Sequence, residues 1–296
     1  MTLEVQHHTL ESTDGTRIAW QSVGTDPSAT TAIVIVNGPG ADLYAWRGFV
    51  EEFAPHLRII AWDYRGFFRS GPPRRPGPIR VEHHCDDLRE VLDAAGIERA
   101  VFVSWSLGTQ VALEFYRTDP ERFAGIVSVN GTYGTPFRTS RAVPGQSLLG
   151  LARSFGPGSG RVMRTMVNAL RVPALFRLTQ RVGLVSATAG QDEFVRIADA
   201  FAVQDPALYA RLIDGFSDHD AEDVLTTIRC PALFFAGRRD PLVPSTYSLY
   251  MAAKVRSADL LVIPIASHYI PIEFAEYLNL RVEAFLAERL PDVWCP

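Results

Sequence analysis

Cysteine and lysine are both scarce in this chain of 296 residues. The three cysteines, Cys85, Cys230 and Cys295, lie far apart, and no CxxC or other Cys/His spacing of a metal site occurs. An odd set of isolated thiols supports neither a disulfide framework nor a zinc site. We therefore expect no metal and no cofactor.

A surplus of positive charge is also absent. The 29 Lys and Arg residues are outnumbered by 33 Asp and Glu residues, the formal net charge is −4, and Lys254 is the only lysine. Binding the phosphates of a nucleic acid requires clustered cationic side chains in surplus, so a nucleic-acid partner is not expected. Long apolar runs are missing as well. No segment approaches the ~20 apolar residues that span a bilayer, and the first residues hold no apolar core of signal-peptide length. These absences predict a cytoplasmic protein without a membrane partner.

What the sequence does contain is a series of short apolar runs that alternate with amphipathic segments. Runs rich in β-branched and aromatic residues are typical of strands that a parallel sheet buries on both faces. Such runs occur at residues 32–36, 57–62, 100–105, 124–129, 232–237 and 259–264. Two further strands, LEVQHHTL and TRIAWQSV, are expected to open the sheet as an antiparallel pair. Repeated βα units with right-handed crossovers predict an α/β fold, with helices on both faces of a doubly wound sheet.

The alternation is interrupted between residues 135 and 223. No segment there shows a strand pattern, and short Arg-bearing stretches of helical character are separated by Gly and Pro, as in GPGSG at 156–160. An irregular loop of this length is uncommon in a compact domain. We therefore predict that residues 135–223 form an inserted helical lid, and that residues 1–134 and 224–296 form the core domain.

The stretch SWSLG marks a tight junction between a predicted strand and a predicted helix. A serine at such a turn is pushed out above the sheet, with the N–H groups of a helix start beside it. The turn demands small residues two positions before and after the nucleophile. Ser104 and Gly108 satisfy this around Ser106, whereas Phe102 rules out a turn centred on Ser104. Ser106 is therefore the candidate nucleophile, and the N–H of Leu107 is a candidate oxyanion donor.

A candidate base and a candidate acid follow two other predicted strands. His268 comes directly after the run 259–264, and Asp240 comes directly after the run 232–237. In a parallel α/β sheet, chemistry collects outside the carboxyl ends of the strands. Ser106, Asp240 and His268 can therefore converge at one edge of the sheet. The chain order of Ser, Asp and His is that of the α/β-hydrolases.

Further motifs strengthen this likeness, and the chain resembles the α/β-hydrolase superfamily over almost its whole length, in the form of a serine hydrolase or esterase with a lid. The matching segments are NGPG at 37–40, WDYRGFFRSG at 62–71, SWSLG, GRRDPLVP and SHYIPIEFAEYLNLRVEAFL. The resemblance implies an eight-stranded, mostly parallel sheet. It also implies that Ser106 is the nucleophile, that His268 is the general base and acid, and that Asp240 orients His268.

Two positions depart from the pattern of this family. The loop after the run 32–36 usually begins with His-Gly, and here it begins with Asn37 and Gly38. The next residue usually supplies the second oxyanion donor, but Pro39 has no N–H. Gly40 is the alternative donor if the loop shifts. Phe68 also stands where the family often has glycine.

The sequence thus predicts a metal-independent serine hydrolase that cleaves a carboxylic ester, lactone or thioester through an acyl-enzyme. The partner is expected to be a small acyl substrate, with Trp46, Trp105, Tyr133 and Tyr269 as candidate walls of its pocket. Alternatives with the same triad are hydrolysis of a carbon–carbon bond and acyl transfer. A ligand-binding protein on a hydrolase scaffold is a third reading. The sequence leaves a homodimer open.

Overall fold

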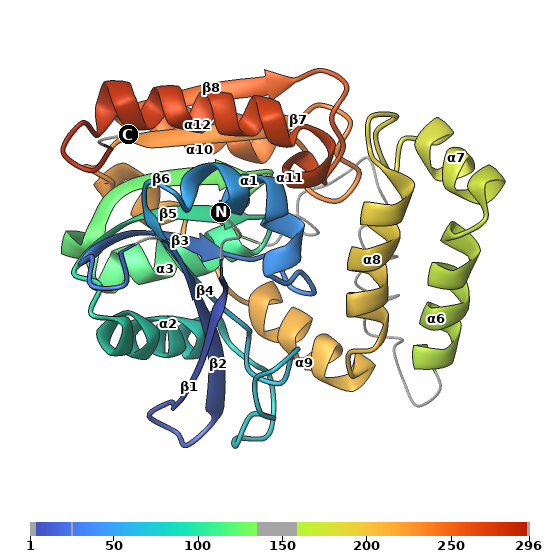
Figure 1. Cartoon of the computed structure of the whole chain (residues 1–296), viewed down its shortest axis with the longest axis horizontal. Coiled ribbons are helices and arrows are strands. Elements are labelled where there is room, and N and C mark those ends of the chain that lie inside the picture. Colours follow the sequence, from blue (N-terminus) through green and yellow to red (C-terminus); the bar gives the residue numbers. More distant parts are fainter. Residues whose placement is uncertain (1–3, 25, 135–158, 295–296) are drawn as a thin grey trace.

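The fold is an eight-stranded sheet with helices on both faces (Figure 1). It is seen in a computed structural model that describes residues 4–24, 26–134 and 159–294. The strands are β1 (Gln6–Glu11), β2 (Arg17–Val23), β3 (Thr31–Val36), β4 (Arg58–Trp62), β5 (Arg99–Trp105), β6 (Phe123–Val129), β7 (Ala232–Gly237) and β8 (Ala258–Ile263). Their order in the sheet is β1-β2-β4-β3-β5-β6-β7-β8.

Strand directions agree with the sequence prediction. β1 pairs antiparallel with β2, and β2 pairs antiparallel with β4. All other neighbours in the sheet are parallel. The expected mostly parallel sheet of eight strands is therefore confirmed. The carboxyl ends of β5, β6, β7 and β8 lie at one edge, which is where chemistry collects in such folds.

The central strands are buried on both faces because helices cover each side. Alternate residues of a strand point to opposite faces, so Val34 packs into one core while Ile33 and Ile35 pack into the other. Helices that cover the first core include α2 (Val81–Ala95), α3 (Gly108–Thr118) and α10 (Thr246–Lys254). Those that cover the second include α1 (Arg47–Phe53), α11 (Ile270–Glu273) and α12 (Ala275–Arg289). Three 3-10 turns, Leu43–Trp46, Pro120–Arg122 and Glu222–Thr227, complete the described core elements.

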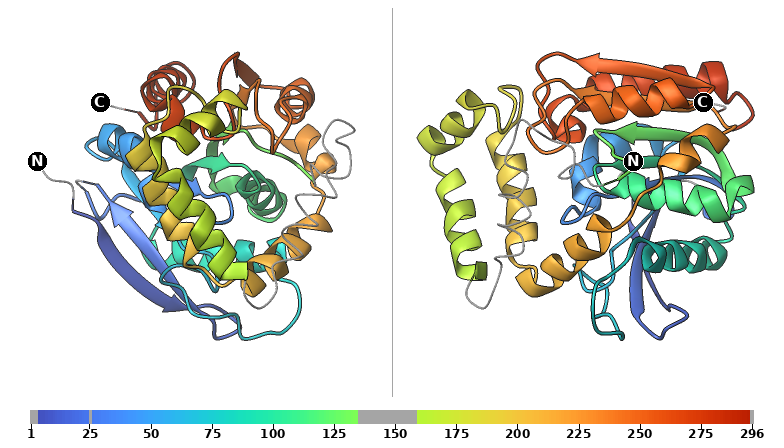
Figure 2. Two further views of the ribbon diagram at one scale, coloured as in Figure 1. Left: turned by 90° about the vertical axis from the view of Figure 1, so that its right-hand side faces the viewer. Right: turned by 180° about the vertical axis from the view of Figure 1, so that it is seen from behind.

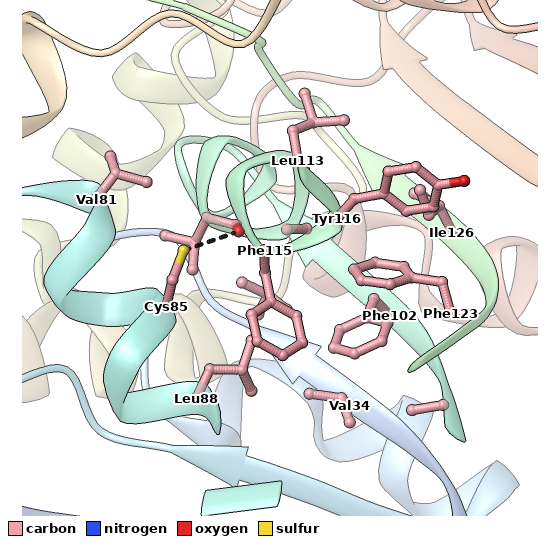
Figure 3. Close-up of a cluster of buried hydrophobic side chains, with 14 of the residues drawn as sticks. Val34, Val81, Cys85, Leu88, Phe102, Leu113, Phe115, Tyr116, Phe123 and Ile126 are labelled. Atoms are coloured by element: carbon pink, nitrogen blue, oxygen red, sulfur yellow. Dashed lines mark hydrogen bonds between the residues drawn. The ribbon is translucent and has the colours of Figure 1, made fainter. Parts of the chain in front are cut away.

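Figure 3 shows how the amphipathic pattern of α2 builds the first core. Val81, Cys85 and Leu88 share one face of this helix and are buried against α3 and the sheet. Phe102 of β5 and Phe123 of β6 stack with ring centroids 3.9 Å apart in this core, on one face of the sheet. Burial of apolar surface of this kind is the main favourable term in folding.

Between β6 and β7, the described residues form four α-helices. They are α6 (Ser159–Leu170), α7 (Pro173–Arg181), α8 (Gln191–Ala202) and α9 (Pro206–Ser217), and we call them the cap helices. Figures 1 and 2 show α6, α7 and α8 beyond the carboxyl edge of the sheet, with α6 and α7 furthest from the core, whereas α9 packs on the first core through Leu212, Ile213 and Phe216. Residues 159–231 hold no strand, and the division into a core domain and a lid at 135–223 stays a prediction. The first part of the predicted lid, residues 135–158, lies outside the described residues.

Among the described residues, no helix is long and apolar enough to cross a bilayer.

The arginine of the WDYRG motif ties three segments together. Arg65 makes a two-pronged ion pair with Asp87 on α2, with bonds of 2.9 and 2.6 Å, and reaches Asp14 in the β1–β2 turn at 2.9 Å. The Arg65 side chain is only 3% exposed and that of Asp87 is fully buried. A buried charge of this kind is tolerated only while its partner is present.

We therefore expect Arg65→Ala to lower the free energy of unfolding by about 3–5 kcal/mol, because it leaves the Asp87 carboxylate buried without its partner. Urea denaturation at neutral pH measures this. The matched control is Arg99→Ala, which removes an exposed ion pair with Asp292 and should cost less than about 1 kcal/mol. Equal losses for the two variants would contradict this assignment.

Candidate active site

Ser106 occupies a strained turn between β5 and α3. Its φ is +58°, in the left-handed region that residues other than glycine seldom adopt. The turn is held by neighbouring strands, since the Ser106 N–H donates to the Val129 carbonyl at 3.0 Å. A Cβ atom at Gly108 would lie 2.3 Å from the Val36 carbonyl oxygen, so no larger residue fits there. Sequence reasoning identified this small-residue requirement correctly.

The structure brings together the three side chains that the sequence predicted. His268 Nε2 lies 2.9 Å from Ser106 Oγ, and His268 Nδ1 lies 2.7 Å from Asp240 Oδ2. Asp240 is fixed through its second oxygen, because Oδ1 accepts the N–H groups of Leu242 and Val243 at 2.7 and 2.8 Å. With Nδ1–H donating to Asp240, Nε2 is free to accept the Ser106 hydroxyl proton.

Burial strengthens this hydrogen-bond chain. The Asp240 side chain is 0% exposed and the His268 side chain is 6% exposed. Electrostatic interactions are less screened away from water than at an open surface. The three groups follow β5, β7 and β8, and strand register alone places them at the same edge. The geometry is that of a nucleophile, a base and an orienting acid.

Asn130 clamps two of the three loops that carry these side chains. It follows β6 with φ +46°, accepts the Gly237 N–H at 2.6 Å, and donates from Nδ2 to the Ser267 carbonyl at 2.9 Å. Gly237 ends the strand before Asp240, and Ser267 precedes His268. Asn130 was not identified from the sequence. The available signal was an Asn directly after a predicted strand, since Asn is one of the few residues that adopt a left-handed conformation.

The candidate oxyanion groups lie on two sides of Ser106. The Leu107 N–H stands at the positive start of α3. Residues 38–41 form a turn in which the Ala41 N–H donates to the Gly38 carbonyl at 3.2 Å and Gly40 takes φ +91°. Within the described ranges, neither the Leu107 N–H nor the Gly40 N–H meets a protein acceptor. Both groups are thus available to a ligand, and their oxyanion role stays a prediction.

Two of the candidate pocket residues lie beside His268. Trp105 donates from its indole N–H to the His268 carbonyl at 2.9 Å, and its ring lies 5.7 Å from the imidazole. Tyr269 packs edge-on against Trp105 and against Phe194 of α8, at 6.0 and 4.9 Å between ring centroids. Burial raises the pKa of the Tyr269 phenol well above its ordinary value, so it stays neutral.

The other two candidate pocket residues lie elsewhere. Trp46 is 0% exposed and donates to Asn37 Oδ1 at 2.6 Å, so its ring supports the loop from within the core. Asn37 thus organises the loop, as expected for the family position. Tyr133 packs against Tyr247 and Tyr250, at 5.4 and 5.3 Å between centroids. In the part of the chain that the structure describes, neither Trp46 nor Tyr133 hydrogen-bonds or stacks with Ser106 or His268, so we do not propose either as a pocket wall.

Two side chains at the end of α8 reach the core loops. A Cβ at Gly40 would lie 2.5 Å from the Phe201 ring, so this ring packs directly on the turn formed by residues 38–41. Gln204, just after α8, accepts the Phe68 N–H at 2.9 Å. Phe68 has φ +48°, which is the conformation that glycine would take at this family position. Sequence reasoning found no partner for Phe68, because the contact spans 136 positions of the chain.

Metal chemistry has no obvious ligand set here: in the part of the chain that the structure covers, no three His, Cys, Asp or Glu side chains are grouped to hold an ion.

Removing the Asn130 clamp should weaken the site and the fold together. Asn130→Gly suits the left-handed backbone and leaves the Ser267 carbonyl and the Gly237 N–H without their partner. Each buried group left unpaired costs about 1–3 kcal/mol. Because two groups lose their partner, chemical denaturation should show a loss of about 2–6 kcal/mol, and Asn130→Ala should cost more because alanine adds backbone strain. An Asn130→Gly protein as stable as the parent would refute the clamp.

Comparison with known proteins is consistent with this geometry. The family model for the alpha/beta hydrolase fold matches residues 31–275. A 2-hydroxymuconate semialdehyde hydrolase of Pseudomonas sp. (strain CF600) is 29% identical over 261 residues, covering 85% of this chain and 84% of that protein.

Solved structures show the same fold. A thermophilic esterase of Thermogutta terrifontis, with malate bound, has a TM-score of 0.73 at 24% identity and covers 96% of this chain and 98% of its own. The enol-lactonase of Burkholderia xenovorans LB400 has a TM-score of 0.73 at 22% identity and covers 95% of this chain and 100% of its own. The family and the fold expected from the sequence are confirmed. The chain therefore belongs to the α/β-hydrolase fold family, and its relatives support a hydrolytic enzyme.

Proposed function

We propose that this protein is a metal-independent serine hydrolase that cleaves a carboxylic ester, lactone or thioester through an acyl-enzyme on Ser106. The observation that supports this most directly is the chain of hydrogen bonds from Asp240 through His268 to Ser106, with distances of 2.7 and 2.9 Å. A serine hydroxyl is a weak nucleophile unless a base accepts its proton. His268 Nε2 lies where that base is required.

In the first half of the reaction, Ser106 Oγ attacks the carbonyl carbon of the substrate while His268 Nε2 takes the hydroxyl proton. The carbonyl oxygen becomes an oxyanion, for which the N–H groups of Leu107 and Gly40 are the donors we propose. His268 then gives its proton to the leaving alcohol or thiol as the bond to carbon breaks. In the second half, His268 removes a proton from water, and the water oxygen attacks the acyl carbon. The bond from that carbon to Ser106 Oγ then breaks, His268 returns the proton to Oγ, and the carboxylic acid is released.

Asp240 acts on His268 and not on the substrate. Its carboxylate accepts the Nδ1–H and stabilises the imidazolium that forms when Nε2 is protonated. The Leu242 and Val243 N–H groups hold the carboxylate in place, so little reorganisation is needed during reaction.

The aromatic rings near the triad favour an apolar acyl group. Trp105 and Tyr269 pack beside His268, and the Phe201 ring packs on Gly40. Aromatic walls bind by burying apolar area. We propose Trp105 and Tyr269 as walls of the substrate pocket.

A second candidate reaction is hydrolysis of a carbon–carbon bond with the same triad. The sequence relative named 2-hydroxymuconate semialdehyde hydrolase favours keeping it. The same triad geometry serves both reactions, so only turnover of test substrates distinguishes ester hydrolysis from carbon–carbon hydrolysis.

A fluorophosphonate probe should label the protein at Ser106, and short p-nitrophenyl esters should be hydrolysed. Ser106→Ala should abolish both, because it removes the only atom that bonds to the acyl group. Peptide mass mapping and absorbance at neutral pH measure the two effects. Labelling without ester turnover would point to the carbon–carbon reaction or acyl transfer. No labelling and no turnover would overturn the proposal in favour of a ligand-binding protein.

Asp240→Asn should lower kcat on the same esters by about 10³–10⁴-fold, because the amide no longer fixes the tautomer of His268 or stabilises its charged form. Steady-state kinetics measure the loss, and circular dichroism confirms the fold. A loss below about tenfold would mean that another group orients His268.

A further inference from the structure

Glu273 is a buried carboxylate that joins the loop of His268 to the cap helices. It ends α11, five positions after His268, and is only 5% exposed. Its Oε2 accepts the Ser267 N–H at 2.9 Å, and its Oε1 accepts the Ser267 hydroxyl at 2.5 Å. The same Oε1 accepts the N–H of Ser186, between α7 and α8, at 2.7 Å.

These three donors surround the buried carboxylate of Glu273. Among the described side chains, no arginine, lysine or histidine makes an ion pair with Glu273. Hydrogen bonds to an ionised acceptor are shorter and stronger than bonds between neutral groups. The Glu273 carboxylate therefore holds both the residue before His268 and the cap residue Ser186, and the donors of both residues stabilise the buried carboxylate.

The contacts of Ser267 show why this matters for the site. Its carbonyl is held by Asn130 Nδ2, and its N–H and hydroxyl are held by Glu273. Ser267 is directly bonded to His268. The main chain at Ser267 is thus held on one side by Asn130 and on the other side by Glu273.

The cap segment is fixed at the same place. Val185 and Ala189 flank Ser186 and are buried in a small cluster with Phe176 and Phe194, against which Tyr269 packs. Tyr269 is the residue after His268. The residues before and after the imidazole therefore both contact the cap, one through Glu273 and one through an aromatic ring.

We propose that Glu273 is a positioning residue that couples the seating of the cap segment 185–189 to the orientation of His268. The inference rests on the proposed serine-hydrolase function. Glu273 touches no reacting atom and acts through Ser267. When the segment 185–189 moves away, Oε1 loses the Ser186 N–H as a donor, and the hydrogen bonds between Glu273 and Ser267 change as a result. A substrate that allows the segment 185–189 to stay in contact with Glu273 therefore also keeps His268 aligned with Ser106.

Glutamine cannot replace glutamate in this role. The three donors need acceptors on both carboxylate oxygens, and an amide offers only one. If the amide oxygen takes the place of Oε1, its NH₂ group faces the Ser267 N–H. If the amide is flipped, its NH₂ group faces the Ser186 N–H. Glu273→Gln therefore breaks one side of the link while keeping shape and volume.

The experiment compares Glu273→Gln with Ser267→Ala and Ser186→Ala. Ser267→Ala removes only the hydroxyl bond to Glu273. Ser186→Ala is the matched control, since it keeps the N–H that Glu273 accepts. Three quantities are measured: the rate constant of fluorophosphonate labelling, the low-field proton NMR signal of His268 Nδ1–H, and amide hydrogen exchange of residues 185–189.

Glu273→Gln should slow labelling by about 10- to 100-fold, the effect of a misplacement of about 1 Å. It should also move the His268 signal. Exchange at 185–189 should speed up, because the Ser186 N–H meets a weaker, neutral acceptor in one orientation of the amide and loses its acceptor in the other. Ser267→Ala should give smaller changes in the same direction, and it decides the matter if Glu273→Gln does not fold. Ser186→Ala should stay within about twofold of the parent.

Unchanged labelling and an unchanged His268 signal in both test variants would overturn the proposal. Slower labelling with unchanged exchange at 185–189 would also overturn it, because the cap would then be uncoupled. If the parent protein neither labels nor hydrolyses esters, the proposed function fails by itself. The NMR signal and the exchange rates then still decide whether Glu273 couples the two segments.

Discussion

Backbone segments approach one another at the carboxyl edge of the sheet more closely than any side chain would allow, and the site depends on this approach. A Cβ at Gly108 would lie 2.3 Å from the Val36 carbonyl oxygen, and one at Gly237 would lie 2.3 Å from the Ser267 carbonyl oxygen. Glycine is the only residue that permits both contacts. Because the segments meet, Ser106 and His268 come within hydrogen-bond distance although 162 positions separate them.

Polar groups behind the triad keep these segments in place. Asn130 binds both the end of β7 and the residue before His268, while Glu273 binds that same residue and the cap. The second oxygen of Asp240 is held by main-chain N–H groups. The donors and acceptors of the site are thus arranged before a substrate arrives, which is how enzymes gain most from electrostatic stabilisation.

Much of the fold and the triad could be predicted from the sequence because the relevant signals are local. The run 100–105 is β-branched and aromatic and lies within β5, and the tight turn after it reveals itself through the small residues Ser104 and Gly108. Asp240 and His268 each follow a strand of a parallel sheet, so topology alone placed them with Ser106. These predictions needed no knowledge of side-chain direction.

The remaining features depend on direction and on distant partners, which a sequence does not display. Trp46 lies near a motif in the sequence, yet its ring turns into the core and binds Asn37. The Asn130 amide finds its partner 137 positions away, and the Glu273 carboxylate finds one of its partners 87 positions away. Such contacts arise only when loops from several strand ends are folded together.

The central claim is that an acyl group is carried by Ser106. A crystal structure of the protein soaked with a slowly hydrolysed ester or lactone tests this most directly. The account predicts continuous electron density from Ser106 Oγ to the acyl carbon, with the acyl oxygen within hydrogen-bond distance of the Leu107 N–H. An intact substrate bound beside an unmodified Ser106 with a water poised for attack, or an acyl group on another residue, would contradict it.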